Sequence, residues 1–209
     1  MAEGLPRVLL FTRGDLVDER GAEALAAELR GLAAAAQGRS WGLVLREPDL
    51  DDRACLGLAC ALAESVPWLA VHDRIHLARA AGADGVHLGW RSLALGPARA
   101  AAGGLALGLS THAEDDPATW RGADYLTHGP IAPTSSKAGL VEPIGIDGFA
   151  RGLARRPDPE QPVLALGGVT RACAAELLAA GAHGVAVIGA VLGAEDPPGA
   201  LLDLLDALG

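Results

Sequence analysis

Residues that can bind ligands or exchange protons come directly after short apolar runs in this chain. They carry imidazole, carboxylate, hydroxyl and guanidinium groups, and imidazole exchanges its proton closest to neutral pH. If the apolar runs are parallel strands, their carboxyl ends meet at one edge and bring these groups together. The candidates are Arg13, Arg46, Glu47, His72, Asp73, Trp90, Ser110, His112 and His128. We therefore expect one site at that edge, with Trp90 and His128 in its substrate pocket.

Two glycine turns suggest a phosphate-binding corner that uses backbone groups. Gly167 and Gly168 precede a predicted helix that begins at Arg171. Glycines allow amide N–H groups to approach an anion, and a helix N-terminus adds partial positive charge. Ile188 and Gly189, at the end of the last predicted strand, offer a second small backbone position. We expect the two turns to bind one phosphate group; a tight turn needed only for packing is the alternative.

A loop rich in hydroxyl groups predicts further phosphate contacts. Thr134, Ser135 and Ser136 supply three hydroxyls, and Lys137 adds an ammonium group directly after them. Such a cluster matches the several acceptor oxygens of a phosphate, although an ordinary polar loop would look similar. Arg46 could bind an anion in the same way or form an ion pair with the glutamate that follows it, and both interpretations stay open.

The apolar runs alternate with Ala/Leu-rich helical stretches along the whole chain. The expected strands are Arg7–Thr12, Gly42–Arg46, Trp68–His72, Gly85–Leu88, Leu105–Ser110, Asp124–His128, Val163–Leu166 and Gly184–Ile188. Expected helices include Ala22–Ala36, Leu50–Glu64, Ala113–Trp120, Arg171–Ala180 and Gly199–Leu208. Continuous apolar strands separated by helices indicate an α/β fold with a buried parallel sheet. Eight strands in 209 residues favour a single (β/α)8 TIM barrel domain over residues 1–209, with an open doubly wound sheet as the alternative.

A weak internal repeat supports the barrel. Gly82, Gly122 and Gly181 each begin a short segment, Gly-Ala-Asp or Gly-Ala-His, between a helical stretch and a strand. Glycine at such a joint can take the left-handed conformation that ends a helix. The same joint repeated three times is typical of a ring of similar units.

Composition limits the possible partners. The chain has 17 basic and 26 acidic residues, a net charge of −9, and 3% aromatic residues. An acidic chain with few aromatics does not attract nucleic acid or anionic lipid through its overall charge. We therefore expect a small-molecule phosphate ligand, no nucleic acid and no membrane, with a homo-oligomer possible in principle.

Cysteine usage and the N-terminus indicate a cytoplasmic protein. The three cysteines form no paired framework, and Cys55 and Cys60 lack the further ligands of a metal site, so we interpret both as small buried apolar residues. No apolar run approaches the roughly 20 residues of a membrane span, and the N-terminus has no signal-peptide pattern.

Several motifs in fixed order carry a resemblance to a known family. They are His72-Asp73-Arg74, Gly82–Gly89, Gly108–His112, Ala123–Tyr125, Gly129–Lys137, Gly167–Thr170 and Gly181–Val187. Together they resemble the thiamine-phosphate synthase/TenI family of (β/α)8 proteins in thiamine biosynthesis, over nearly the whole chain. The resemblance implies a synthase that joins a pyrimidine diphosphate to a thiazole phosphate and releases pyrophosphate with Mg²⁺.

The resemblance also implies roles for individual residues. Asp73 matches a metal-binding carboxylate, and Gly168 matches the cradle for the thiazole phosphate. The positions that match contacts to phosphate oxygens are Arg46, Ser110, Thr134, Ser136 and Lys137.

The chain departs from the family pattern on the diphosphate side of the site. A glutamine and a lysine on the second strand are replaced by Val44 and Pro48, and an asparagine is replaced by His72. Trp90 and Ser92 stand where a glutamine and a second metal-binding aspartate are expected, and a serine after the eighth strand is Gly189. Trp90 is expected to fill space that the pyrimidine would need.

We therefore expect the smaller reaction of the TenI branch, the proton transfer that aromatises a thiazole phosphate tautomer. His112 is the candidate base, His72 a second acid or base, and Ser110 part of the catalytic element. His76, His87 and His183 are interpreted as structural or solvated, and His128 has no assigned role beyond the pocket. No cofactor is expected for a tautomerase, and Mg²⁺ for a synthase. A divergent synthase and a non-catalytic phosphate-binding barrel are the alternatives.

Overall fold

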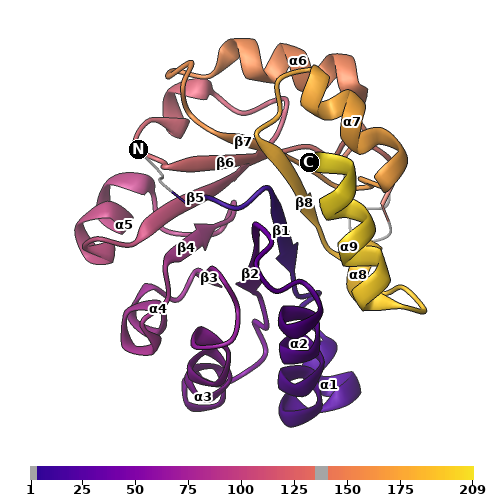
Figure 1. The fold of residues 1–209 in the computed structure, drawn as a ribbon. Coiled ribbons are helices and arrows are strands. Elements are labelled where there is room, and N and C mark those ends of the chain that lie inside the picture. Colours follow the sequence, from indigo (N-terminus) through magenta and orange to yellow (C-terminus); the bar gives the residue numbers. More distant parts are fainter. Residues whose placement is uncertain (1–3, 135–140) are drawn as a thin grey trace.

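The computed structural model describes residues 4–134 and 141–209 and contains a closed barrel of eight parallel strands. Each strand pairs with its neighbours in sequence, and β1 pairs with β8 to close the ring (Figure 1). The strands are β1 (Val8–Phe11), β2 (Trp41–Leu45), β3 (Leu69–His72), β4 (Gly85–Leu88), β5 (Ala106–Thr111), β6 (Tyr125–His128), β7 (Val163–Leu166) and β8 (Gly184–Val187). The (β/α)8 TIM barrel predicted from the sequence is confirmed, and the open sheet is excluded.

Helices surround the strands on the outside of the barrel (Figure 1). They are α1 (Leu16–Arg20), α2 (Ala22–Ala35), α3 (Asp52–Ala63), α4 (Ile75–Ala81), α5 (Leu95–Ala102), α6 (Gly145–Arg155), α7 (Arg171–Ala179), α8 (Gly189–Leu192) and α9 (Pro197–Leu208). The expected helix at Ala113–Trp120 is wrong, since only a 3-10 turn, η1 (Pro117–Trp120), forms there. Asp116 caps that turn by accepting a hydrogen bond from the Ala118 N–H, and Pro117 cannot continue a helix from the preceding residues.

Apolar side chains form two cores, one on each side of the strands. The larger core lies between strands and helices and includes Trp41, Trp120 and Phe149. The smaller core fills the barrel and includes Leu9, Phe11, Val44, Tyr125 and Leu164. Because most strands are buried on both faces, with partly exposed residues in β3 and β5, they read as continuous apolar runs.

The repeated Gly-Ala-Asp joints fasten neighbouring strands where they begin. Gly82 and Gly122 have φ of 68° and 93°, as the left-handed joint requires. The carboxylates that follow accept hydrogen bonds from backbone N–H groups of the preceding strands: Asp84 from Leu69 at 2.8 Å and Asp124 from Leu107 at 2.7 Å. The repeat therefore serves the alignment of the strands.

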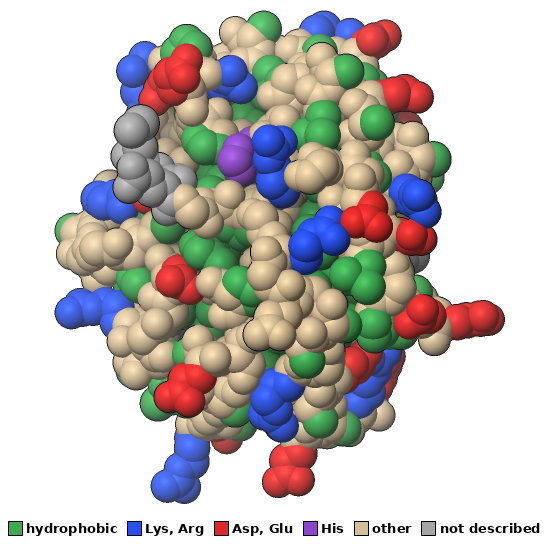
Figure 2. All heavy atoms as spheres, in the orientation of Figure 1, with side chains coloured by type: hydrophobic (Ala, Val, Ile, Leu, Met, Phe, Trp, Pro, Cys, Tyr) green, Lys and Arg blue, Asp and Glu red, His purple; other side chains and the backbone are tan. Residues whose placement is uncertain are grey.

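Charge and cysteine placement complete the description. Lys and Arg side chains are interspersed with Asp and Glu over the face shown in Figure 2. Cys55 is buried as expected, but Cys60 is exposed, so its interpretation as a buried apolar residue is wrong. Within the described part of the chain, no helix is long and apolar enough to cross a membrane.

Gly108 and Gly57 give a matched pair of stability predictions. A β-carbon at Gly108 would lie 2.1 Å from Cζ of Tyr125 inside the barrel. A β-carbon at Gly57, on α3, would have no neighbouring atom within 4 Å outside its own helix backbone. We expect Gly108→Ala to lower the free energy of unfolding by about 2 kcal/mol through overpacking. Gly57→Ala should raise it by about 0.5–1 kcal/mol through helix propensity. Urea denaturation measures both; equal effects would contradict the packing described for Tyr125.

Candidate functional site

Three polar side chains gather where β3 and β4 end. The His72 Nδ1 lies 3.1 Å from Oδ2 of Asp73. The Ser92 hydroxyl donates to Oδ1 of Asp73 and accepts the Gly89 N–H at 2.6 Å. Both carboxylate oxygens of Asp73 therefore have polar partners, and Ser92 ties the loop after β4 to the end of β3.

Asp73 is held in an unusual state by this arrangement. It is the one described residue other than glycine with a positive φ, 61°, a conformation that costs energy unless the surroundings enforce it. Partial burial raises the pKa of its carboxyl, but hydrogen bonds from His72 and Ser92 outweigh that effect, so its pKa lies below the usual range. Asp73 is consequently an anion at neutral pH, directly at the rim of the barrel.

A second polar group lies just inside the barrel, beneath the end of β5. His87 contacts Ser110 through Nε2 at 2.9 Å and Tyr125 through Nδ1 at 3.0 Å. The Thr127 hydroxyl donates to Ser110 Oγ at 3.2 Å, and the Phe11 ring packs edge-on against His87. Ser110 thus marks the boundary between the apolar interior and the rim.

The hydrogen-bond directions follow from the buried position of Tyr125. If the Tyr125 hydroxyl accepted from Nδ1, its own proton would have no described partner in the core, which is costly. We therefore assign the phenol as donor to Nδ1, so that Nε2–H of His87 donates to Ser110. Ser110 Oγ then accepts from both His87 and Thr127, and its own O–H is left to donate to a group at the rim.

His112 lies two residues beyond Ser110, past the end of β5. Its side chain is 18% exposed, and its Nδ1 lies 3.7 Å from Oδ2 of Asp115. Asp115 also accepts the His112 backbone N–H at 2.7 Å. The carboxylate therefore orients the segment that follows β5, and alternation along the strand places His112 on the same side as Ser110.

Arg46 and Glu47, which follow β2, do not form the ion pair that the sequence left open. Glu47 is 4% exposed and accepts backbone N–H groups from Gly14 and Val17, each at 3.4 Å. The Arg46 guanidinium donates to the Arg13 carbonyl at 2.7 Å. Glu47 thus organises the loop after β1, and Arg46 has no carboxylate contact among the described residues.

The two glycine turns follow β7 and β8, which are neighbours in the barrel. Gly167 and Gly168 have φ of 90° and 67°. A β-carbon at Gly168 would lie 2.7 Å from the Ala132 carbonyl oxygen, so close approach of the loop after β6 already requires glycine there. The space beside Gly189 is open, and Ile188 packs partly buried against the inner core. Phosphate binding at this corner stays a prediction.

The hydroxyl-rich loop is only partly described. Thr134 follows β6 and is partly buried at the carboxyl end of the barrel. Ser135, Ser136 and Lys137 lie outside the described residues, so their predicted phosphate contacts stay predictions.

His128 does not line a substrate pocket, and that prediction is wrong. Its ring points outward from β6 and packs against Trp120 and Phe149. Nδ1 lies 2.9 Å from the Thr111 hydroxyl, which itself donates to the Thr127 carbonyl, so Nδ1 carries the proton. Burial lowers the pKa of His128 to about 4. His128 is a neutral packing residue between the barrel and the helices.

Trp90 does not fill the space inside the rim, contrary to expectation. It is 78% exposed, in the loop between β4 and α5. The prediction that Trp90 fills the mouth of the barrel is therefore wrong. Its ring does not close the space above His72 and Ser110.

The hydrogen bonds that join His87 to Tyr125 and Ser110 are the feature that the sequence interpretation missed. His87 is fully buried, which agrees with its interpretation as a structural residue, but its hydrogen bond to Ser110 was not predicted. Burial lowers its pKa to about 3. The sequence did contain a signal. His87 stands in an otherwise apolar strand, and a buried histidine needs a polar partner. Tyr125 lies two strands further along the barrel.

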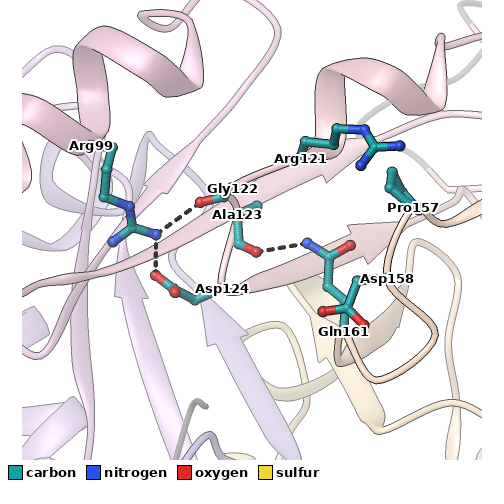
Figure 3. Close-up of a pocket in the computed structure, with 8 residues that line it drawn as sticks. All are labelled: Arg99, Arg121, Gly122, Ala123, Asp124, Pro157, Asp158 and Gln161. Atoms are coloured by element: carbon teal, nitrogen blue, oxygen red, sulfur yellow. Dashed lines mark hydrogen bonds and ion pairs between the residues drawn. The ribbon is translucent and has the colours of Figure 1, made fainter.

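A cavity of about 490 Å³ lies at the opposite end of the barrel, near the starts of β6 and β7. Figure 3 shows Arg99 directed toward Asp124 and the Gln161 amide directed toward the Ala123 carbonyl. The ion pair and amide contact hold the strand starts together. None of the predicted site residues lines this cavity, so the candidate site is the other rim.

Comparison with known proteins agrees with this geometry. Residues 16–191 match the thiamine monophosphate synthase family. A putative thiamine-phosphate synthase of Geobacter sulfurreducens is 43% identical over 179 residues, which cover 80% of this chain and 83% of that protein. The chain belongs to the thiamine monophosphate synthase family. The resemblance predicted from the motifs is therefore confirmed.

A further relative and a solved structure have names from the same family. The thiamine-phosphate synthase of Salinispora tropica is 47% identical over 141 residues, 66% of each chain. A thiamine phosphate pyrophosphorylase from Pyrococcus furiosus superposes with a TM-score of 0.81 at 26% identity, covering 100% of this chain and 98% of that one. These names support the synthase alternative over the tautomerase that the departures from the pattern had favoured.

The buried histidines make stability depend on pH. The folded pKa of His128 is about 4 and that of His87 about 3, both below the ordinary 6.5. Below pH 6.5 the unfolded chain therefore binds more protons than the folded chain. The free energy of unfolding that the neutral histidines contribute above that pH is lost as the pH falls toward 4. Each histidine should contribute about 2 kcal/mol to the loss between pH 7 and pH 5.

Urea denaturation of His128→Asn at pH 7, 6 and 5 tests this expectation. The asparagine amide can still donate to Thr111, and the pH-dependent loss should shrink by about 2 kcal/mol relative to the unsubstituted protein. His76→Asn, which changes an exposed imidazole paired with Asp52, is the control. An unchanged slope in His128→Asn would contradict the neutral buried state.

Proposed function

We propose that this protein is a thiamine-phosphate synthase, a transferase that joins a pyrimidine diphosphate to a thiazole phosphate and releases pyrophosphate. The observation that carries the proposal is the 43% identity over 179 residues to a putative synthase, on a chain whose rim retains Arg46, Asp73, Ser110 and Gly168. The TenI-like tautomerase and the non-catalytic barrel become outcomes of the test.

The rim groups suit the charge changes of this reaction. The thiazole nitrogen forms a bond to the methylene carbon of the pyrimidine while the carbon–oxygen bond to the diphosphate breaks. The electron pair of the broken bond leaves with the diphosphate, so negative charge grows on its oxygens. Arg46 has a guanidinium without a carboxylate contact, and the Ser110 O–H is directed away from His87 and Thr127. Donors placed in advance stabilise such a charge most effectively.

The thiazole phosphate has a separate place in this proposal. The backbone at Gly168, after β7, lies across the barrel mouth from Asp73, which follows β3, and Gly189 follows the neighbouring strand β8. Binding the two substrates on opposite sides would bring the thiazole nitrogen and the methylene carbon together over Ser110. Positioning of this kind lowers the barrier by removing translational freedom before reaction.

The residues present fit Mg²⁺ as a partner of the diphosphate. Mg²⁺ prefers oxygen ligands and is often bound by one or two carboxylates together with substrate phosphates. Asp73 is anionic and has Ser92 beside it, and the described residues contain no group of three His, Cys, Asp or Glu that could form a metal site alone. Asp73 would hold the ion, and bound Mg²⁺ would neutralise diphosphate charge.

The decisive experiment incubates the protein with the pyrimidine diphosphate and the thiazole phosphate, with Mg²⁺ or with a chelator. Thiamine phosphate should form with Mg²⁺ and be lost in chelator. Conversion of a thiazole phosphate tautomer in chelator, without thiamine phosphate, would instead identify a tautomerase. Binding without either product would identify a non-catalytic barrel.

Ser110→Ala tests the hydroxyl that the inner hydrogen bonds orient. Loss of one hydrogen bond to a charged oxygen should lower kcat/KM about 10–100-fold. Thr119→Ala, which removes an exposed hydroxyl bonded to the Asp116 carbonyl at 2.6 Å, should leave kcat/KM unchanged. Steady-state kinetics with circular dichroism melting separates the two effects, and equal activity of both variants would remove Ser110 from the site.

A further inference from the structure

The cavity at the end of the barrel opposite the candidate site has a lining of balanced charge. Its volume is about 490 Å³, and its walls are the residues that precede β6 and those that precede β7. A space of this size accommodates a small molecule. The charged residues of the lining are two basic and two acidic ones, Arg99, Arg121, Asp124 and Asp158. A ligand that carries one sign of charge would meet opposing charges here, whereas a zwitterion can contact both signs.

Gln161 is the buried polar side chain of this cavity. It is 7% exposed, and its Nε2 donates to the carbonyl oxygens of Ala123 at 2.7 Å and of Trp120 at 3.4 Å. These contacts fix the amide, because a flipped amide would turn its oxygen toward two carbonyl oxygens. Oε1 therefore faces away from Ala123 (Figure 3), and it has no hydrogen-bond partner among the described residues. A buried acceptor without a donor is destabilising, so an N–H group of a ligand would satisfy Oε1.

The ion pair of Arg99 and Asp124 forms one wall of the cavity. The Arg99 guanidinium contacts Oδ2 of Asp124 at 2.6 Å and donates to the Gly122 carbonyl at 2.8 Å. Figure 3 shows this pair on one side of the Gly122 and Ala123 backbone and the Gln161 amide on the other side. The charges of the pair neutralise each other, so the binding of a further charge falls to the other two charged residues.

Arg121 and Asp158 lie on the same side of that backbone as Gln161, and neither forms a described ion pair. The Arg121 side chain is exposed and contacts no carboxylate within residues 4–134 and 141–209. Asp158 accepts the Glu160 N–H at 3.0 Å, which shapes the turn before β7, and it has no basic partner in the same ranges. In Figure 3 the Arg121 guanidinium and the Asp158 carboxylate stand on either side of the Gln161 amide. A cation, an anion and a neutral acceptor are thus available together.

We propose that this cavity binds a small zwitterion of the α-amino acid class. The ammonium group of the ligand donates to Oε1 of Gln161 and to the Asp158 carboxylate. Its carboxylate contacts the Arg121 guanidinium, whose planar shape matches two carboxylate oxygens. A phosphate would have only the charge of Arg121 in its favour and would lie near the Asp158 carboxylate. The site is at the opposite end of the barrel from Asp73 and Ser110, so it is independent of the proposed transferase reaction.

Nuclear magnetic resonance tests this binding without turnover and without either thiamine precursor. Protein carrying a nitrogen isotope label is titrated with each of the standard L-amino acids, and the side-chain amide signals of Gln161 are followed. At least one amino acid should shift these signals to saturation with a Kd of about 1 mM or lower. The matched amine and carboxylic acid, which lack its carboxylate or its ammonium group, should bind about tenfold more weakly. Absence of a saturable shift with every amino acid, or equal binding of either analogue, would overturn the proposal.

Variants of the two exposed charged residues test where the amino acid binds. Arg121→Ala and Asp158→Asn should each raise its Kd about tenfold, through loss of one charge-assisted contact. The asparagine can still accept the Glu160 N–H, so the turn is retained. Arg30→Ala on α2 and Asp18→Asn on α1 are the matched controls, since both side chains are exposed and lie outside the cavity lining. The controls should keep the Kd within about twofold, and equal Kd values in all four variants would show that the amino acid binds elsewhere and overturn the site.

Discussion

The ring of Tyr125 occupies the space where a side chain at position 108 would stand, and the inner end of the site depends on this contact. A β-carbon at Gly108 would be 2.3 Å from the phenol oxygen. With its ring fixed there, the phenol reaches Nδ1 of His87, and the opposite nitrogen reaches Ser110. The interior contains few polar groups, so a reversed hydrogen bond would leave a buried proton unpaired. Packing thus determines the direction of a hydroxyl at the rim.

Much of the architecture could be predicted from the sequence because its signals are local. Continuous apolar runs and the Gly-Ala-Asp joints predicted eight strands, and β4 and β7 have the predicted bounds. Residues at the strand ends were correctly assigned to one rim for His72, Asp73 and Ser110. The failures have a common cause. In a strand buried on both faces, apolar residues do not show which side chains point inward, so Thr127 and His128 could not be distinguished before the structure placed His128 outside.

Loop conformation was the other feature that the sequence did not determine. Trp90 was expected to fill space that the pyrimidine would need because it stands where the family pattern has a glutamine. In the structure its indole is exposed, on a loop where the Gly89 N–H bonds to Ser92. Similarly, Glu47 could have paired with Arg46, yet backbone N–H groups of the loop after β1 take its carboxylate. Several acidic side chains accept hydrogen bonds from the backbone in this way. A negative net charge is therefore compatible with binding an anion through the few basic side chains that have no carboxylate partner.

Asp84 and Asp124 bond the starts of neighbouring strands at the end of the barrel far from the proposed chemistry. The register of these adjacent strands is therefore fixed at one end of the barrel by the short side chains of Asp84 and Asp124. Insertions, deletions and substitutions in the loops at the other end can then accumulate without sliding one strand past the next. The loops at the carboxyl rim, such as those that carry Pro48 and Trp90, can therefore vary while the barrel keeps its dimensions.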